Sequence, residues 1–185
     1  MSEQRSLLSR SPGSDLAVFQ FSGHGALIDG EFYLLPYGVD VGDAVSIEAT
    51  ALPASALRQQ LDGLAQYGRV LVLLDACHSG GEMANGQALS VDAGRLRAEL
   101  AGSNITVLTS SSAEQVSRED ASWGHGAFTA ILLEALDNAD TDKNGMISVS
   151  ELTAYLTRHV PALTKDAQTP SVEMRFDGDI FVAGP

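Results

Sequence analysis

Apolar residues along the chain fall into short continuous runs and into series with helical spacing. The three clearest runs cover residues 15–21 (DLAVFQF), 70–74 (VLVLL) and 105–109 (ITVLT), and each leads into a polar or glycine-rich stretch. Short apolar runs bounded by turn residues are typical of strands buried within a sheet. Residues 31–35, stopped by Pro36, predict a small hairpin or an edge strand, because proline cannot donate to a sheet ladder.

Helical spacing marks three other segments. Apolar residues recur at that spacing within residues 46–67, which predict one helix, and again within 126–136 and 151–160. The tail carries apolar positions at 171–174 and 179–182 and predicts one or two closing strands. Strands that alternate with helices predict an α/β fold, with a mostly parallel sheet covered on both faces.

Two segments lack these patterns. Residues 1–14 are polar and contain Pro12-Gly13, so we expect a loose leader before a domain that spans residues 15–185. Residues 81–103 are small and polar with one basic cluster, and they predict either a mobile connection or a short helix.

Composition restricts the partners and the compartment. The 185 residues fit one domain, and a single cysteine excludes an intramolecular disulfide. Neither a signal peptide nor an apolar run of about 20 residues is present, so the cytoplasm is the default location. The net charge of −13 disfavours nucleic acid and anionic membranes and favours cationic peptides or divalent cations. Nothing in the composition indicates an organic cofactor.

Two of the predicted strands lead into residues that can react. His24 follows the first run, between two glycines that predict the end of that strand, and Cys77 follows the second run. If the two strands are parallel neighbours, His24 and Cys77 emerge at the same sheet edge. An imidazole beside a thiol can activate it as a nucleophile, and the amides of Gly25 and Cys77 could stabilise an oxyanion. The alternative is an inert small thiol and a surface histidine.

These residues lie in two motifs, FSGHG (21–25) and LLDACHSG (73–80). Together the motifs resemble the caspase-like cysteine peptidase superfamily, in its metacaspase and bacterial orthocaspase branch. Paired motifs about 50 residues apart are far more specific than either motif alone. The resemblance covers residues 15–183, and residues 110–115, 124–136 and 168–170 also fit it.

The resemblance implies a caspase-like three-layer α/β/α sandwich. It divides the domain into a large-subunit-like part (15–80), a linker (81–103) and a small-subunit-like part (104–185). It also implies that His24 is the general base and that Cys77 is the nucleophile, which forms an acyl-enzyme with a polypeptide substrate.

Charge indicates which side chain such a substrate would present. Caspases carry Gln two positions before the cysteine and cleave after Asp, whereas this chain has Asp75 there, as in metacaspases and paracaspases. A carboxylate on the floor of the S1 pocket favours Arg or Lys. The alternative role for Asp75 is to cap a loop by accepting backbone hydrogen bonds. The resemblance to paracaspases implies a second pocket acid at Glu119, with Asp120 as its near competitor; a solvated surface charge is the alternative.

Residues 140–151 (DTDKNGMISVSE) satisfy the twelve-residue calcium-loop pattern, with predicted helices on both sides. Gly145 supplies the sharp turn of that pattern. The alternative is a tight helix connection without a metal. The oxygen ligands would come from Asp140, Asp142, Asn144, the Met146 carbonyl, Ser148 and a bidentate Glu151. The resemblance also implies calcium, because calcium dependence is common among metacaspase-like enzymes.

The chain departs from the family at its amino end. Caspase-like domains normally begin with a strand and a helix before the histidine strand, whereas residues 1–14 here are polar. We therefore expect the His24 strand at a sheet edge, and the chain to be a truncated domain, a processed subunit, or a chain completed by a missing N-terminal segment or a partner. Arg95 and Arg97, in the linker, are candidate self-cleavage points, or solvated charges if the linker forms a packed helix.

The leading hypothesis is a calcium-assisted cysteine endopeptidase that cleaves after Arg or Lys. The alternatives are a catalytically inactive caspase-like binding module and a calcium-binding interaction domain in which Cys77 is incidental.

Overall fold

The computed structural model describes residues 15–77, 92–112, 115, 118, 120, 123–124, 126–174 and 181–183. The elements in chain order are β1 (Leu16–Ile28), β2 (Glu31–Leu35), α2 (Ala44–Thr50), β3 (Leu52–Pro53), α3 (Ala54–Ala65), β4 (Arg69–Cys77), α4 (Ala93–Leu100), β5 (Ile105–Thr109), α5 (Ala127–Asn138), β6 (Ile147–Ser148), α6 (Val149–Thr164), β7 (Ser171–Glu173) and β8 (Phe181–Ala183).

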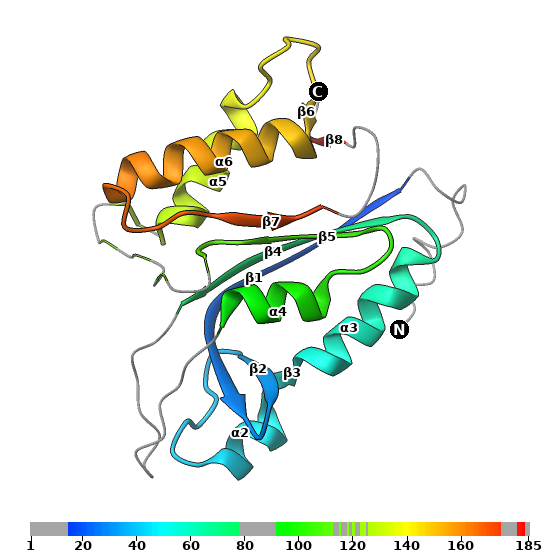
Figure 1. Ribbon diagram of the computed structural model, residues 1–185, viewed down its shortest axis with the longest axis vertical. Coiled ribbons are helices and arrows are strands. Elements are labelled where there is room, and N and C mark those ends of the chain that lie inside the picture. Colours follow the sequence, from blue (N-terminus) through cyan, green and yellow to red (C-terminus); the bar gives the residue numbers. More distant parts are fainter. Residues whose placement is uncertain are drawn as a thin grey trace.

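A six-stranded sheet runs through the centre of the molecule in the order β3-β2-β1-β4-β5-β7 (Figure 1). Its core, β1-β4-β5, is parallel, and antiparallel strands complete it on both sides. The tail therefore contributes β7 to this sheet. The last strand, β8, instead pairs with β6 in a separate two-stranded sheet.

Helices cover both faces of this sheet, because side chains on a strand alternate between its two sides. Val70, Val72 and Leu74 of β4 pack against α3 and α4 on one face. Leu71 and Leu73 pack against α5 and α6 on the other face. Figure 1 shows the two helix pairs on opposite sides of the sheet. The expected three-layer α/β/α architecture, with its mostly parallel sheet, is confirmed.

Residues 46–67 contain the expected helix as α3, but the spacing did not predict a second helix there. Two helices, α2 and α3, occupy this segment, and Leu52–Pro53 lies between them as the short strand β3. Pro53 lacks a backbone N–H and has an extended conformation, with φ −68° and ψ 141°. Proline tolerates the start of a helix but not its interior, so the chain breaks there and begins α3 afresh.

The first strand is longer than expected. The glycines around His24 predict its end, but β1 continues to Ile28. The second half of β1 pairs antiparallel with β2, with His24 opposite Leu35 and Ile28 opposite Glu31. Ladder hydrogen bonds to β2 compensate for the conformational freedom that the glycines lose. Helix α2 then packs through Ile47 on this hairpin, beside the carboxyl end of the sheet's parallel core.

Candidate functional site

The carboxyl ends of β1 and β4 bring His24 and Cys77 to neighbouring positions. The two strands are parallel neighbours, and His24 is the register partner of Cys77. Adjacent strands lie about 4.8 Å apart, so the two backbones are within reach of one substrate carbonyl. The His24 side chain is exposed to solvent, whereas Gly25 is buried. The side chain of Cys77 and residues 78–91 lie outside the described part of the chain.

A close contact at the opposite end of the two strands establishes this register. The Arg69 amide donates to the Asp15 carbonyl at 3.0 Å. A Cβ on Gly68 would collide with the same carbonyl oxygen, so only glycine lets the two segments approach this closely. From this contact the parallel ladder runs in register from Leu16 and Arg69 to His24 and Cys77.

Asp75 lies two residues before Cys77, and its side chain is buried, with 2% exposed. Its Oδ2 accepts a hydrogen bond of 2.7 Å from Thr129 Oγ1, in the first turn of α5. The positive end of a helix dipole favours a carboxylate at this position. Asp75 is therefore held near the carboxyl end of β4, on the α5 side of the sheet. This position is compatible with both roles expected from the sequence, an acid of the S1 pocket and a loop cap.

Sequence analysis missed Thr129 as a partner of Asp75. A hydroxyl within residues 127–133, which are otherwise apolar, was the available signal. Gly126, at the N-cap of α5, also contacts this carboxylate, because a Cβ built there would lie 3.0 Å from Asp75 Oδ2. The amino end of α5 thus packs directly against the candidate pocket acid.

A buried glutamine organises the segment that follows β5. Gln168 has no exposed surface; its Nε2 donates to the Ser110 carbonyl at 2.8 Å, and its Oε1 accepts from the Arg118 amide at 2.7 Å. The segment next to Glu119 is thereby tied to the chain before β7. Glu119 itself lies outside the described residues, while Asp120 is exposed. Gln168 belongs to residues 168–170, which fit the caspase-like pattern, but the sequence does not indicate that its side chain bridges two segments.

The two candidate self-cleavage residues lie in α4, not in an open linker. Arg95 donates to the Gly30 carbonyl at 3.0 Å and stacks over the Phe32 ring at 5.2 Å. Arg97 donates to Thr109 Oγ1 at 3.3 Å. Leu96 and Leu100 anchor the helix in the core. Because both arginines contact the folded core, the helix alternative is the one that the structure favours.

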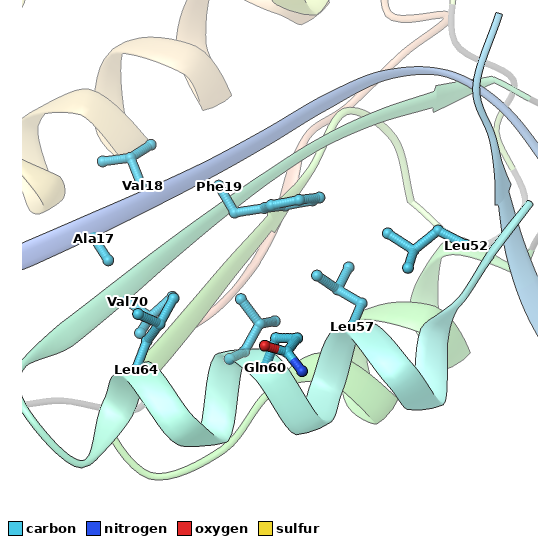
Figure 2. Close-up of a pocket in the computed structure, with 9 residues that line it drawn as sticks. Ala17, Val18, Phe19, Leu52, Leu57, Gln60, Leu64 and Val70 are labelled. Carbon is cyan, nitrogen blue, oxygen red and sulfur yellow. The ribbon is translucent and has the colours of Figure 1, made fainter. Parts of the chain in front are cut away.

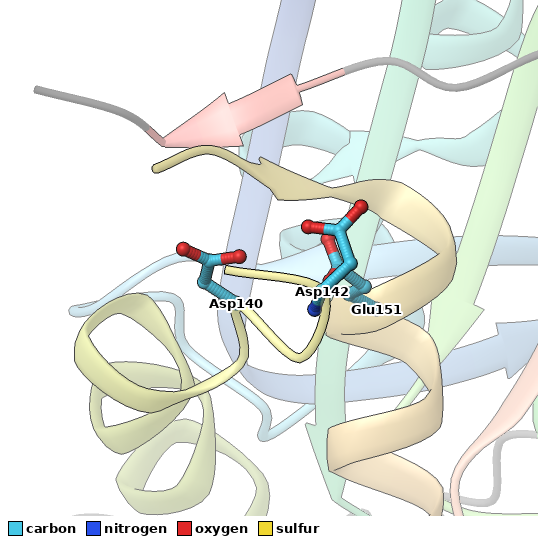
Figure 3. A group of neighbouring side chains, drawn as sticks. All are labelled: Asp140, Asp142 and Glu151. Atoms are coloured by element: carbon cyan, nitrogen blue, oxygen red, sulfur yellow. The ribbon is translucent and has the colours of Figure 1, made fainter. Parts of the chain in front are cut away.

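The loop between α5 and α6 folds around its own carboxylates (Figure 3). Asp140 accepts from the Asn144 and Gly145 amides at 3.1 and 2.9 Å. Gly145 has φ +84°, the left-handed conformation that the sharp turn of the motif requires. Ser148 caps α6, and Glu151 completes the capping box by accepting from the Ser148 amide at 3.0 Å. Strand β6, within this loop, pairs with β8.

The geometry of this loop fits a calcium ion. Oxygens of Asp140, Asp142 and Glu151 all lie within 4.8 Å of one another. Calcium binds oxygen at 2.3–2.6 Å, so two ligands on opposite sides of one ion lie about 5 Å apart. The Ser148 amide, followed by the Thr141 and Ser148 side chains, lowers the pKa of Glu151 from 4.5 to about 2. The bidentate ligand of the pattern is therefore ionised at neutral pH.

Comparison with known proteins places these features in a family. A family model described as "Caspase domain" matches residues 3–181. No curated protein matches the chain. Within the described ranges, no helix combines the length and apolar character needed to cross a membrane.

Two solved structures share the fold. Protein GSU0716 from Geobacter sulfurreducens is 19% identical, with a TM-score of 0.58 over 93% of this chain and 70% of its own. Caspase-1 from Spodoptera frugiperda is 16% identical, with a TM-score of 0.56 over 99% of this chain and 71% of its own. At these identities the likeness concerns the fold alone, whereas the family model covers nearly the whole sequence. The chain thus belongs to the caspase domain family.

Proposed function

We propose that this protein is a cysteine endopeptidase of the metacaspase type that hydrolyses peptide bonds after Arg or Lys. The observation that carries the proposal is the register pairing of His24 with Cys77 at the carboxyl ends of parallel strands. In open α/β sheets, this edge is where ligands bind. Membership of the caspase domain family supports peptide-bond hydrolysis as the reaction.

In the proposed mechanism, His24 and Cys77 share the chemistry. His24 accepts the thiol proton, and the Cys77 sulfur attacks the scissile carbonyl carbon. The amides of Gly25 and Cys77 donate to the developing oxyanion. The C–N bond then breaks, and the His24 imidazolium protonates the leaving amine. Water, deprotonated by His24, finally hydrolyses the thioester and releases the acid product and the free thiol.

The preference for a basic P1 side chain is assigned to Asp75, with Glu119 as the second acid. A guanidinium or ammonium group of the substrate that enters beside the carboxyl end of β4 would meet the buried Asp75 carboxylate, which Thr129 holds in place. Charge-assisted hydrogen bonds in such a partly dehydrated slot are about twice as strong as neutral ones. An Asp side chain at P1 would be repelled by the same group.

Calcium is assigned to the loop Asp140–Glu151. Asp140, Asp142 and Glu151 would supply charged oxygens, and Asn144, the Met146 carbonyl and Ser148 would complete the set. The loop joins α5, which contacts Asp75, to α6. The ion would thereby clamp two helices of the α5/α6 layer together at that loop.

Short fluorogenic peptides test the catalytic proposal. The chain is assayed on matched peptides ending in Arg, Lys or Asp, with calcium and with chelator. We expect cleavage after Arg and Lys, its loss in Cys77→Ala, and a fall of about 10²–10⁴-fold in His24→Ala. His159→Ala is the matched control, because His159 stacks on Tyr155 of α6 at 4.1 Å, away from β1.

Two results would contradict this proposal. Cleavage that survives in Cys77→Ala would assign the activity to another nucleophile. Calcium binding without turnover of any of the peptides would favour the alternative function, a catalytically inactive caspase-like binding module.

A further inference from the structure

Among the described strands, the first half of β1 is paired on one side only. Only β4 pairs with Leu16–Gly23 among the described strands, because β2 begins its pairing at His24. The Asp15 carbonyl points toward β4, where it accepts from the Arg69 amide. Because the backbone groups of successive residues alternate between the two sides of a strand, the N–H and C=O groups of every second residue from Leu16 point away from β4, to the unpaired side. These residues are Leu16, Val18, Gln20 and Ser22. Such an edge is a ready template for another segment of polypeptide.

An apolar groove adjoins this edge (Figure 2). It lies between β1 and α3 and has a volume of about 280 Å³. Ala17 and Phe19 line it from the strand, and Leu57, Leu61 and Leu64 line it from the helix. On the same strand, Val18 is 55% exposed. A cavity of about 150 Å³ accommodates one benzene ring, so the groove has room for about two side chains of leucine size.

We propose that residues 1–14 of this chain fold back over the edge of β1 and place Leu7 and Leu8 in the groove. Met1, Leu7 and Leu8 are the large apolar residues of this segment, and only the two leucines are adjacent. Leu8 is seven residues before Asp15, a length that spans up to about 24 Å when extended. Helix α3 has 12 residues and is about 18 Å long, so the whole groove is within reach.

Charge and the family match support the same occupant. Residues 1–14 carry Arg5 and Arg10 against Glu3, whereas the whole chain has a net charge of −13. A cationic segment is attracted to an acidic domain. The caspase domain model already matches from residue 3, so the segment lies within the matched family sequence. A tethered segment also has a local concentration in the millimolar range, which a second copy of the chain cannot match in dilute solution.

Docking would stabilise the strand that carries His24. Apolar surface of Phe19 and Leu64 would be removed from water, and the outward backbone groups of β1 would gain partners within the chain. The consequence is a structural one, independent of whether Cys77 is a nucleophile.

Disulfide trapping in the full chain tests the position of the segment. Cys77→Ala removes the native thiol, and Leu8→Cys is combined with either Gln60→Cys, which lines the groove, or Gln59→Cys, one position along α3. We expect an intrachain disulfide to form about tenfold faster with Gln60→Cys. Equal rates for the two pairs would overturn the proposal. Disulfides between chains would assign the groove to a second copy instead.

Thermal unfolding provides a second measurement that needs no cross-link. Leu7→Ser combined with Leu8→Ser is expected to lower Tm by about 5 °C or more, because two buried leucines are lost. The matched control is Leu133→Ser combined with Leu136→Ser, two leucines that are 49% and 41% exposed on α5. An equal effect of the two double variants would contradict docking.

Discussion

The hydroxyl of Thr129 donates to the carboxylate of Asp75 at 2.7 Å, which joins the carboxyl end of β4 to the first turn of α5. These residues are 54 positions apart in the sequence. The bond fixes the orientation of the buried Asp75 carboxylate, two residues before Cys77. Its donor belongs to α5, in the helix layer that also carries the loop Asp140–Glu151. Substitutions at Thr129 therefore test how the candidate pocket is held.

Thr129→Val removes this donor while keeping the shape of the side chain. We expect a loss of about 1–3 kcal/mol in the free energy of unfolding, because a buried acceptor loses a partner. We also expect a lower kcat/KM on peptides ending in Arg. Urea unfolding and peptide kinetics measure the two effects. Thr157→Val is the control, because Thr157 lies on the exposed surface of α6 and its hydroxyl donates to the Thr153 and Ala154 carbonyls of the same helix.

Gly68→Ala tests the contact that establishes the β1–β4 register. Its new Cβ would collide with the Asp15 carbonyl oxygen, so we expect destabilisation of about 1–3 kcal/mol. Gly63→Ala is the matched control, because a Cβ at Gly63, inside α3, would meet nothing within 4 Å. That variant is expected to gain about 0.5–1 kcal/mol from helix propensity. Equal effects in urea unfolding would refute the role of the Gly68 contact.

Acid pH should loosen the loop between α5 and α6. The folded-state pKa of Glu151 is about 2, below its usual value of 4.5, because the Ser148 amide and neighbouring hydroxyls stabilise the carboxylate. Its contribution to stability is thus complete above about pH 4.5 and is lost as the pH falls toward 2. Carbon-detected NMR titration of the Glu151 carboxyl in chelator measures this pKa. A midpoint near 4.5 would contradict the hydrogen-bonded geometry.

Calcium should raise the stability of the folded chain. A ligand present at about 100 times its Kd stabilises the native state by about 2.7 kcal/mol. We expect this gain to disappear in Glu151→Gln, which removes the bidentate ligand, and to persist in Asp137→Asn, an exposed acid of α5 outside the loop pattern. Thermal unfolding with and without calcium measures the difference. An unchanged gain in Glu151→Gln would place calcium elsewhere.

Elements and motifs whose whole signal lies within one short continuous segment could be predicted from the sequence. The strands β4 and β5 are aliphatic runs, and the loop Asp140–Glu151 has its whole ligand set within twelve positions. The positions of His24 and Cys77, each shortly after a buried apolar run, could be predicted for the same reason. Where the local pattern was misread, pairing with another strand decided the outcome: β2 extends β1 past His24, and Pro53 pairs with Tyr33 of β2.

The sequence by itself determined which segments become buried strands and helices, and it indicated the candidate reactive pair and the candidate calcium loop, because hydrophobic period, turn chemistry and ligand spacing are local properties. Tertiary structure alone decided that His24 is the register partner of Cys77, that Asp75 is held by Thr129, and that the groove beside β1 opens against α3. Each of these depends on the register and packing of segments far apart in the chain, which close approaches such as that of Gly68 to Asp15 impose.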